Sequence, residues 1–249
     1  MIDTRRVRAV FFDAAGTLFR VRGGSVGAIY AEVMNRHGAS LPAGVIQERF
    51  REVFSCAPPP VFPGADPRDV PLLERDWWHA LVAEVMRPAS PFERFEQCFA
   101  ELFELFRTAR GWELDPDARR VLDVLAAEGH TLGVITNFDS RVRDVLRHLG
   151  IAPYFQGVIL AAEEGVAKPH PALFRIAMRR HHLREGEAVY VGDDPSSDVE
   201  GALAAGMIPV LIDPLGGPFP PGELRISSLG ELVGRLLGAA SASLGDPRP

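Results

Sequence analysis

The stretch RAVFFDAAGTLF, residues 8–19, decides the fold of this chain. Its apolar run ends at a carboxylate, Asp13, and a turn of small residues follows at 14–17. Continuous apolar runs rich in Val and Phe are typical of strands that are buried on both faces of a parallel sheet. Ligands of such sheets bind at the carboxyl ends of the strands. We therefore expect an α/β protein with a functional carboxylate at position 13.

Four further short apolar runs predict the rest of the sheet, at 131–137, 157–160, 188–193 and 208–213. Helical periodicities precede or separate them, at 115–130, 139–149, 171–182 and 198–205. Asp115 is the expected N-cap of the first of these helices. Strands and helices that alternate in this way predict a doubly wound parallel sheet with a Rossmann-like core.

Roughly a hundred residues separate the first predicted strand from the second, and they show helical periodicity instead of apolar β-runs. The four helical segments lie at 26–38, 43–54, 71–86 and 91–106. Apolar residues in the last segment recur at spacings of three and four, which is typical of one face of an amphipathic helix. We expect a core domain of residues 1–19 and 111–240, an inserted helical domain of residues 20–110, and a disordered tail at 241–249.

Composition excludes several functional classes. The formal net charge is −6, which argues against a general nucleic-acid-binding surface. No apolar run approaches the roughly 18 residues of a membrane span, and the run that ends at Asp13 is too short for a signal peptide. We expect a cytoplasmic protein without nucleic-acid or membrane partners, with Cys56 and Cys98 as free thiols. The sequence leaves the oligomeric state open.

Chemically distinct side chains follow the ends of four predicted strands. Because the carboxyl ends of parallel strands meet at one edge of the sheet, we expect these side chains to share one crevice. Only one of them is an amine, and it belongs to the single lysine of the chain. In chain order the candidates are Asp13, Thr17, Thr136, Asn137, Lys168, Asp193, Asp194 and Asp198.

The same segments resemble the four ordered motifs of the haloacid dehalogenase-like hydrolase superfamily. They read DAAGTLF (13–19), ITN (135–137), KPHPALF (168–174) and VGDDPSSDVEGALAAGM (191–207). The resemblance covers the whole chain and implies that the inserted helices form a helical cap domain over the α/β core. RDWW (75–78) and TNFDSRV (136–142) are similar to the subgroup that includes haloacid dehalogenase-like hydrolase domain-containing protein 3.

The resemblance implies a Mg²⁺-dependent hydrolase, most plainly a phosphatase that acts on a small phosphorylated metabolite. Asp13 would be the nucleophile and would form an aspartyl-phosphate. Lys168 would neutralise Asp13 and the phosphoryl group, which otherwise repel each other. The Asp13 carboxylate, the backbone carbonyl of Ala15 and Asp193 would bind the Mg²⁺, an ion that prefers oxygen ligands.

The resemblance assigns the remaining candidates to supporting roles. Thr17, Thr136 and Asn137 form the implied phosphate-binding set. Within it, Thr136 would donate its hydroxyl, backbone N–H groups near Asn137 would assist, and Thr17 would hold the turn at 14–17. Asp198 would support the metal site from behind. Asp194 stays open between an indirect contact with the metal and a solvated position in its loop.

Position 15 departs from the pattern of phosphatases in this superfamily, which carry a second aspartate there as general acid and base. Here the residue is Ala15. A positioned general acid contributes about 10²- to 10⁴-fold in rate. We therefore expect turnover to favour esters with good leaving groups.

Because the general acid is missing, other functions remain open. A phosphate-metabolite binding or regulatory protein with little turnover could retain all the other candidates. The 2-haloacid dehalogenases also lack the acid, but they carry an aromatic residue at that position and a neutral one at the position of Asp193, so they are the weaker alternative. Phosphonoacetaldehyde hydrolase needs a lysine in its cap, and the only lysine here, Lys168, belongs to a core motif.

Overall fold

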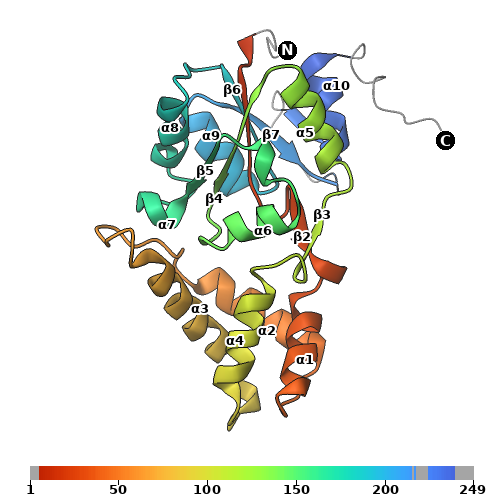
Figure 1. Cartoon of the computed structure of the whole chain (residues 1–249), viewed down its shortest axis with the longest axis vertical. Helices are drawn as coiled ribbons and strands as arrows, with labels where there is room; N and C mark the ends of the chain where they lie inside the picture. The colour runs from red at the N-terminus through yellow and green to blue at the C-terminus, as the bar shows by residue number, and fades with distance from the viewer. Residues whose placement is uncertain (1–5, 215, 217–223, 239–249) are drawn as a thin grey trace, which may run out of the picture.

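The structure, a computed structural model, describes residues 6–214, 216 and 224–238, so the tail predicted at 241–249 lies outside the described residues. Within these residues six strands form one parallel sheet in the order β5-β4-β1-β6-β7-β8 (Figure 1). The strands are β1 (Ala9–Phe12), β4 (Thr131–Thr136), β5 (Gly157–Leu160), β6 (Ala188–Gly192), β7 (Ile208–Ile212) and β8 (Leu224–Ile226). The predicted doubly wound α/β fold is confirmed.

Strand β1 lies in the middle of the sheet and explains why its sequence is apolar throughout. Its alternate residues belong to two different hydrophobic clusters, Val10 and Phe12 to one and Ala9 and Phe11 to the other. Both faces of the strand are therefore covered, as the continuous apolar run requires.

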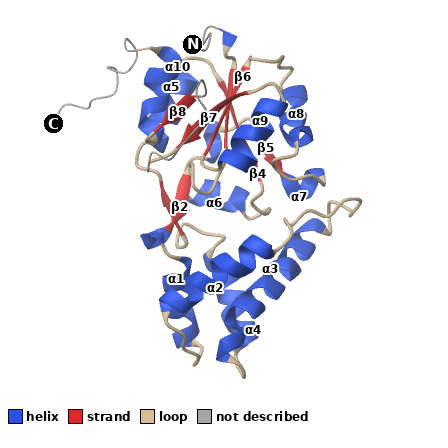
Figure 2. Cartoon of the chain, turned by 180° about the vertical axis from the view of Figure 1, so that it is seen from behind, coloured by secondary structure: helices blue, strands red, loops and turns tan. Residues whose placement is uncertain are grey.

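Helices cover the two faces of the sheet (Figures 1 and 2). The first cluster is closed by α5 (Ala118–Ala127), α6 (Val142–His148) and α10 (Leu232–Leu237). The second is closed by α7 (Ala161–Glu164), α8 (Pro171–Arg180) and α9 (Gly201–Ala204), the last preceded by a π-helical segment, Pro195–Glu200. Short 3₁₀ turns lie at Arg22–Gly24, Arg87–Ala89, Ala152–Tyr154 and Leu229–Glu231.

The long insertion after β1 forms four helices at one end of the molecule, which we call the helical unit (Figure 1). They are α1 (Val26–Arg36), α2 (Ala43–Cys56), α3 (Val70–Met86) and α4 (Phe95–Leu105). A third hydrophobic cluster holds them together, and the predicted apolar face of α4 buries Phe99 and Leu102 in it. Cys98 is buried and Cys56 is exposed, and both are free thiols as predicted. No helix among the described residues is long and apolar enough to cross a membrane.

Three strands were not anticipated by the sequence reading. β2 (Phe19–Val21) and β3 (Trp112–Leu114) form an antiparallel pair where the chain passes between the sheet and the helical unit, and β8 extends the sheet edge. Each has only three residues, too few for an alternating pattern to stand out.

The prediction that Asp115 is the N-cap of the helix before β4 is wrong. Asp117 is the N-cap of α5, while the Asp115 carboxylate accepts the N–H of Asp117 at 2.9 Å in the preceding turn.

Candidate active site

Asp13 follows the last residue of β1, and Lys168 reaches it from the loop between α7 and α8. The Lys168 Nζ atom donates to Asp13 Oδ1 at 2.7 Å, to Asp198 Oδ1 at 2.6 Å and to the Tyr190 hydroxyl at 3.0 Å. All four residues are buried. Burial opposes the charge on Lys168, but the carboxylates of Asp13 and Asp198 outweigh it and raise the pKa of the lysine. The ammonium is therefore fixed beside Asp13 in its charged form.

Asn137 positions the backbone of this lysine. Its side-chain Nδ2 donates to the carbonyl of Lys168 at 3.1 Å, and its Oδ1 accepts the N–H of Lys168 at 2.9 Å. The amide side chain thus ties the loop after β4 to the loop after α7. The side chain of Asn137 holds the backbone of Lys168 in place.

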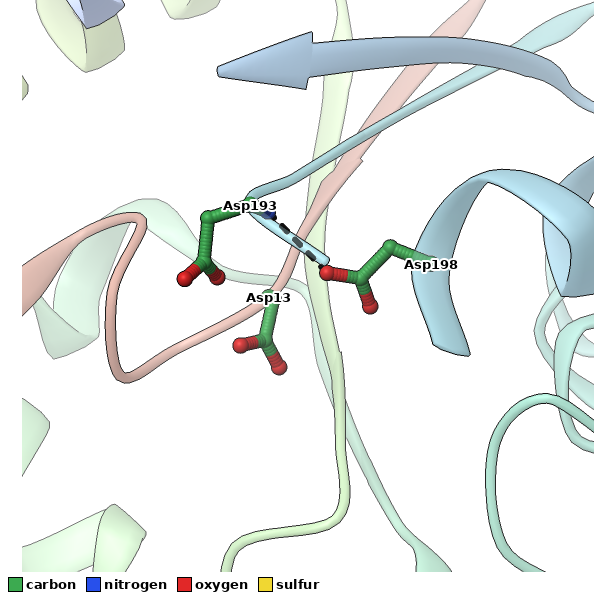
Figure 3. A group of neighbouring side chains, drawn as sticks. All are labelled: Asp13, Asp193 and Asp198. Atoms are coloured by element: carbon green, nitrogen blue, oxygen red, sulfur yellow. Dashed lines mark hydrogen bonds between the residues drawn. The ribbon is translucent and has the colours of Figure 1, made fainter. Parts of the chain in front are cut away.

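Three carboxylates meet at the ends of β1 and β6. Each of Asp13, Asp193 and Asp198 offers an oxygen within 4.8 Å of the others (Figure 3). Asp198 has both oxygens engaged: Oδ1 accepts Lys168 Nζ, and Oδ2 accepts the backbone N–H groups of Asp193 at 3.0 Å and Asp194 at 3.1 Å. Asp198 therefore braces the site, and Asp13 and Asp193 are the carboxylates free to take a ligand.

The electrostatics of this group call for a cation. The side chain of Asp193 is exposed to the cavity, yet surrounding protein limits its hydration. This desolvation and the carboxylates of Asp13 and Asp198 raise the pKa of Asp193 to about 7. Three carboxylates beside one ammonium carry a formal net charge of −2. An oxygen-rich group with this excess charge fits a divalent cation such as Mg²⁺.

The turn at 14–17 fits closely around Asp193. Gly16 has φ +101°, and a Cβ placed there would lie 2.3 Å from Asp193 Oδ2, so both the backbone conformation and the space require glycine. The Thr17 hydroxyl donates to Asp193 Oδ1 at 3.4 Å, which makes it a support of the turn and of Asp193. Ala15 lines the cavity beside them.

Two further predicted residues are placed at the strand ends. The buried Thr136 lines the cavity, and its Oγ1 accepts the N–H of Phe138 at 3.1 Å, which leaves its own proton available to a ligand. Asp194 is exposed and accepts the N–H of Ser197 at 2.7 Å, so that it caps the segment Pro195–Glu200.

These side chains form the floor of a cavity of about 570 Å³ between the sheet and the helical unit. The opposite side is built from aromatic rings of α1, α2 and α3, which we call the aromatic wall. Trp77 and Trp78, the two tryptophans of the RDWW segment, belong to it. The aromatic wall consists of Tyr30, Phe50, Phe54, Trp77 and Trp78.

A second polar cluster, absent from the sequence-based predictions, fastens α3 to the loop after β4. Trp78 Nε1 donates to Asp139 Oδ2 at 2.6 Å, and Arg141 Nε donates to Asp139 Oδ1 at 2.8 Å. Glu74, also buried, accepts the N–H and the hydroxyl of Ser140. Burial raises the pKa of Glu74 to about 7, against the lowering effect of Ser140. RDWW and TNFDSRV, quoted above only as marks of a subgroup, are therefore in contact with each other.

Comparison with known proteins agrees with this geometry. Residues 7–206 match the family of haloacid dehalogenase-like hydrolases. Haloacid dehalogenase-like hydrolase domain-containing protein 3 of Xenopus laevis is 31% identical over 244 residues, which cover 96% of this chain and 99% of the relative.

Two solved structures share the fold over nearly the whole length. A HAD phosphatase from Thermococcus onnurineus superposes with a TM-score of 0.63 at 26% identity and covers 93% of this chain and 99% of its own. A 2-haloacid dehalogenase from Pseudomonas syringae pv. tomato DC3000 superposes with a TM-score of 0.62 at 27% identity and covers 93% of this chain and 98% of its own. Both activities therefore occur on this fold, and the side chains of the site must separate them.

Proposed function

Since the chain belongs to the haloacid dehalogenase-like hydrolase family, we propose that it is a Mg²⁺-dependent phosphatase that acts on a small phosphorylated metabolite in the cytoplasm. The observation that carries the proposal is the Lys168 ammonium, 2.7 Å from the Asp13 carboxylate, in a group with two further aspartates. A carboxylate can attack a phosphate dianion only where positive charge offsets their repulsion. This site is built around that requirement.

Asp13 is the proposed nucleophile. Its Oδ1 accepts the bond from Lys168, so the other oxygen is available to attack phosphorus. The new bond joins Asp13 to phosphorus while the ester P–O bond breaks. The leaving group departs with the bonding electrons as an oxyanion and takes its proton from water, because Ala15 carries no acid. Water then attacks the phosphorus of the aspartyl-phosphate, which releases inorganic phosphate and restores the carboxylate.

The carboxylates of Asp13 and Asp193 and the backbone carbonyl of Ala15 would hold the cation, and Asp198 would support these ligands. Mg²⁺ would supply positive charge against the phosphoryl oxygens. The excess negative charge of the site supports this assignment, as do the second oxygens of Asp13 and Asp193, for which no hydrogen bond to a described residue is seen.

Phosphate recognition is assigned to the loop after β4. Thr136 would donate its free hydroxyl proton to a phosphate oxygen, and the backbone near Asn137 would donate N–H groups. The hydrogen bond from the Thr17 hydroxyl to Asp193 supports a turn-holding role for Thr17 instead of direct phosphate contact.

The helical unit, within the predicted inserted domain 20–110, is proposed to act as the cap. Its aromatic wall faces the floor of the cavity, and closure of such a unit excludes water from the phosphoryl group. The contacts of Glu74 and Trp78 with the loop after β4 would hold the cap in the closed position.

Comparing an aryl phosphate with an alkyl phosphate in the presence of Mg²⁺ tests the role of position 15. Because Ala15 cannot protonate a leaving alcohol, we expect the aryl ester to turn over at least about 10²-fold faster. Equal rates would contradict this account of the missing acid. Chelation of Mg²⁺ should abolish both activities.

A binding or regulatory protein with little turnover is the second candidate, and Ala15 favours it. A screen of phosphorylated metabolites that reads both phosphate release and thermal stabilisation separates the two. Stabilisation without release would support the binding protein. Metal-independent halide release from 2-haloacids would instead reveal the weaker alternative, a dehalogenase, which the retained Asp193 argues against.

A further inference from the structure

We infer that the phosphate ester carries an aromatic alcohol, whose ring packs against the aromatic wall. The inference rests on the proposed phosphatase function and names the class of substrate for the same site. The observations behind it come from the aromatic wall, which lies opposite the proposed phosphate site. The proposed catalytic steps do not use this wall.

The aromatic wall is a continuous surface of rings. The centroids of Tyr30 and Phe50 are 5.8 Å apart, those of Phe50 and Phe54 are 5.5 Å apart, and those of Phe54 and Trp78 are 6.1 Å apart. Trp77 and Trp78 meet edge to face at 4.9 Å. Offset and edge-to-face contacts with such rings stabilise a further aromatic ring beyond the area that it buries.

Part of this wall is open to the cavity, although Tyr30 also belongs to the buried hydrophobic cluster of the helical unit. Phe54 is 47% exposed, and both tryptophans are only half-buried although they line a cavity of about 570 Å³. A volume of this size exceeds what a phosphate and a short aliphatic chain need, and it matches pockets that enclose ring-containing ligands.

Charges along the cavity argue against a second anionic group on the substrate. The described cations that line it already have acidic neighbours. Lys168 bonds Asp13 and Asp198, Arg141 bonds Asp139 at 2.6 Å, and the exposed Arg20 lies 3.8 Å from Glu113. A carboxylate or second phosphate would compete with these carboxylates for the cations, whereas an uncharged ring would not.

Tyr30 offers a polar group within the aromatic wall. Its side chain is buried and lines the cavity, and its hydroxyl makes no hydrogen bond to another residue of 6–214, 216 or 224–238. The hydroxyl is accessible, because it is not among the fully buried atoms that lack a partner. A polar substituent on the substrate ring would replace water as its partner.

The test separates ring recognition from leaving-group chemistry by using two alkyl esters, benzyl phosphate and ethyl phosphate, with Mg²⁺ present. Neither ester has a good leaving group, so Ala15 penalises both. We expect the KM of benzyl phosphate to be at least about tenfold lower. Phenylphosphonate, which cannot be hydrolysed at its P–C bond, should raise the melting temperature more than methylphosphonate does.

Matched variants of two phenylalanines complete the design. Phe54→Ala removes a ring of the aromatic wall and should raise the KM of benzyl phosphate about three- to tenfold, while the KM of ethyl phosphate stays within twofold. Phe92→Ala removes a half-buried ring of the helical unit that is not among the described residues lining the cavity, and it should leave the KM ratio unchanged.

The outcomes distinguish this inference from the proposed function. Equal KM values for the two esters, with phosphate released from both, would overturn the aromatic substrate and leave the phosphatase intact. Selective stabilisation by phenylphosphonate without release from any ester would retain the aromatic site and overturn the phosphatase. If no ester releases phosphate and phenylphosphonate gives no selective stabilisation, both the phosphatase and the aromatic site are overturned.

Discussion

The two sides of the cavity are built in opposite ways. The floor at the sheet edge holds charged groups in fixed positions, and the Lys168 ammonium alone makes three hydrogen bonds there. The aromatic wall is mainly apolar: Phe54 stacks on Phe50 and on Trp78 and meets Trp77 edge to face. The floor therefore suits a reaction of charged groups that need fixed positions, and the wall suits selection among substrates. Chemistry and recognition come from different parts of the chain.

The connections between the two sides are few but specific. The β2–β3 pair carries the chain in both directions, and Trp78 and Glu74 bond the loop after β4. The floor brings together residues as far apart in sequence as Asp13 and Lys168, which are separated by 155 positions. The following predictions test whether the floor and the wall can be changed independently, from the largest expected effect to the smallest.

Asp13→Asn removes the attacking carboxylate and should lower kcat by at least about 10⁴-fold, because a nucleophile acts together with all its supporting groups. Phosphate release from an aryl ester measures the loss. Asp123→Asn changes a carboxylate on α5 that bonds the Tyr154 hydroxyl, and it should keep nearly full activity. Retention of even a hundredth of the activity by Asp13→Asn would break the assignment of the floor.

Lys168→Met removes the only ammonium of the floor and should lower kcat about 10²- to 10³-fold. It also leaves the buried carboxylates of Asp13 and Asp198 without their counter-charge, so thermal stability should fall in the absence of Mg²⁺. The binding of rings to the aromatic wall should persist, read as stabilisation by phenylphosphonate. A variant with normal turnover would show that the lysine is only structural.

Ala15→Asp restores a carboxyl at the position where phosphatases of the family carry their general acid. We expect the kcat/KM of an alkyl phosphate, which reports formation of the intermediate, to rise about 10²-fold and that of an aryl phosphate to change little. Ala15→Asn, which has a similar size but cannot transfer a proton in this way, is the matched control. An equal gain with both variants would point to packing instead of acid catalysis.

Glu74→Gln tests the joint, by which we mean the contacts of Glu74 and Trp78 with the loop after β4. The test is the pH dependence of stability. Burial raises the pKa of folded Glu74 from 4.5 to about 7. Between these values the folded state holds a proton that the unfolded state has lost, so this group destabilises the fold as pH rises. Between pH 5 and pH 8, the free energy of unfolding of the glutamine variant should rise by on the order of 2 kcal/mol relative to that of the wild type. Parallel stability curves would contradict a titrating Glu74.

The sequence predicted the sheet and most of its site because the relevant signals are local. The strand at 9–12 is apolar throughout, and Asp13 ends it. General rules of parallel sheets then place Lys168 and Asp193 beside Asp13. The three-residue strands β2 and β3 were missed, since their pairing depends on where the chain enters and leaves the helical unit.

The aromatic wall and the joint could not be derived in the same way. Trp78 contacts Asp139 across 61 positions, and nothing in either segment specifies the partner. An aromatic residue in a helix reads as core from its periodicity alone, although Phe54 and Trp77 prove to face a cavity. Which face of an inserted bundle meets the sheet is decided by packing between the two parts, a property that local patterns do not encode.

The most direct test of the central claim is mass spectrometry of the enzyme after acid quenching during turnover of an aryl phosphate with Mg²⁺. An aryl ester forms the intermediate without help from a general acid, whereas Ala15 leaves no general base for water attack on it, so the phosphorylated form should accumulate. The account predicts a phosphorylated peptide modified at Asp13 and lost in Asp13→Asn. Continued phosphate release with no phosphorylated peptide, and unchanged in Asp13→Asn, would contradict it.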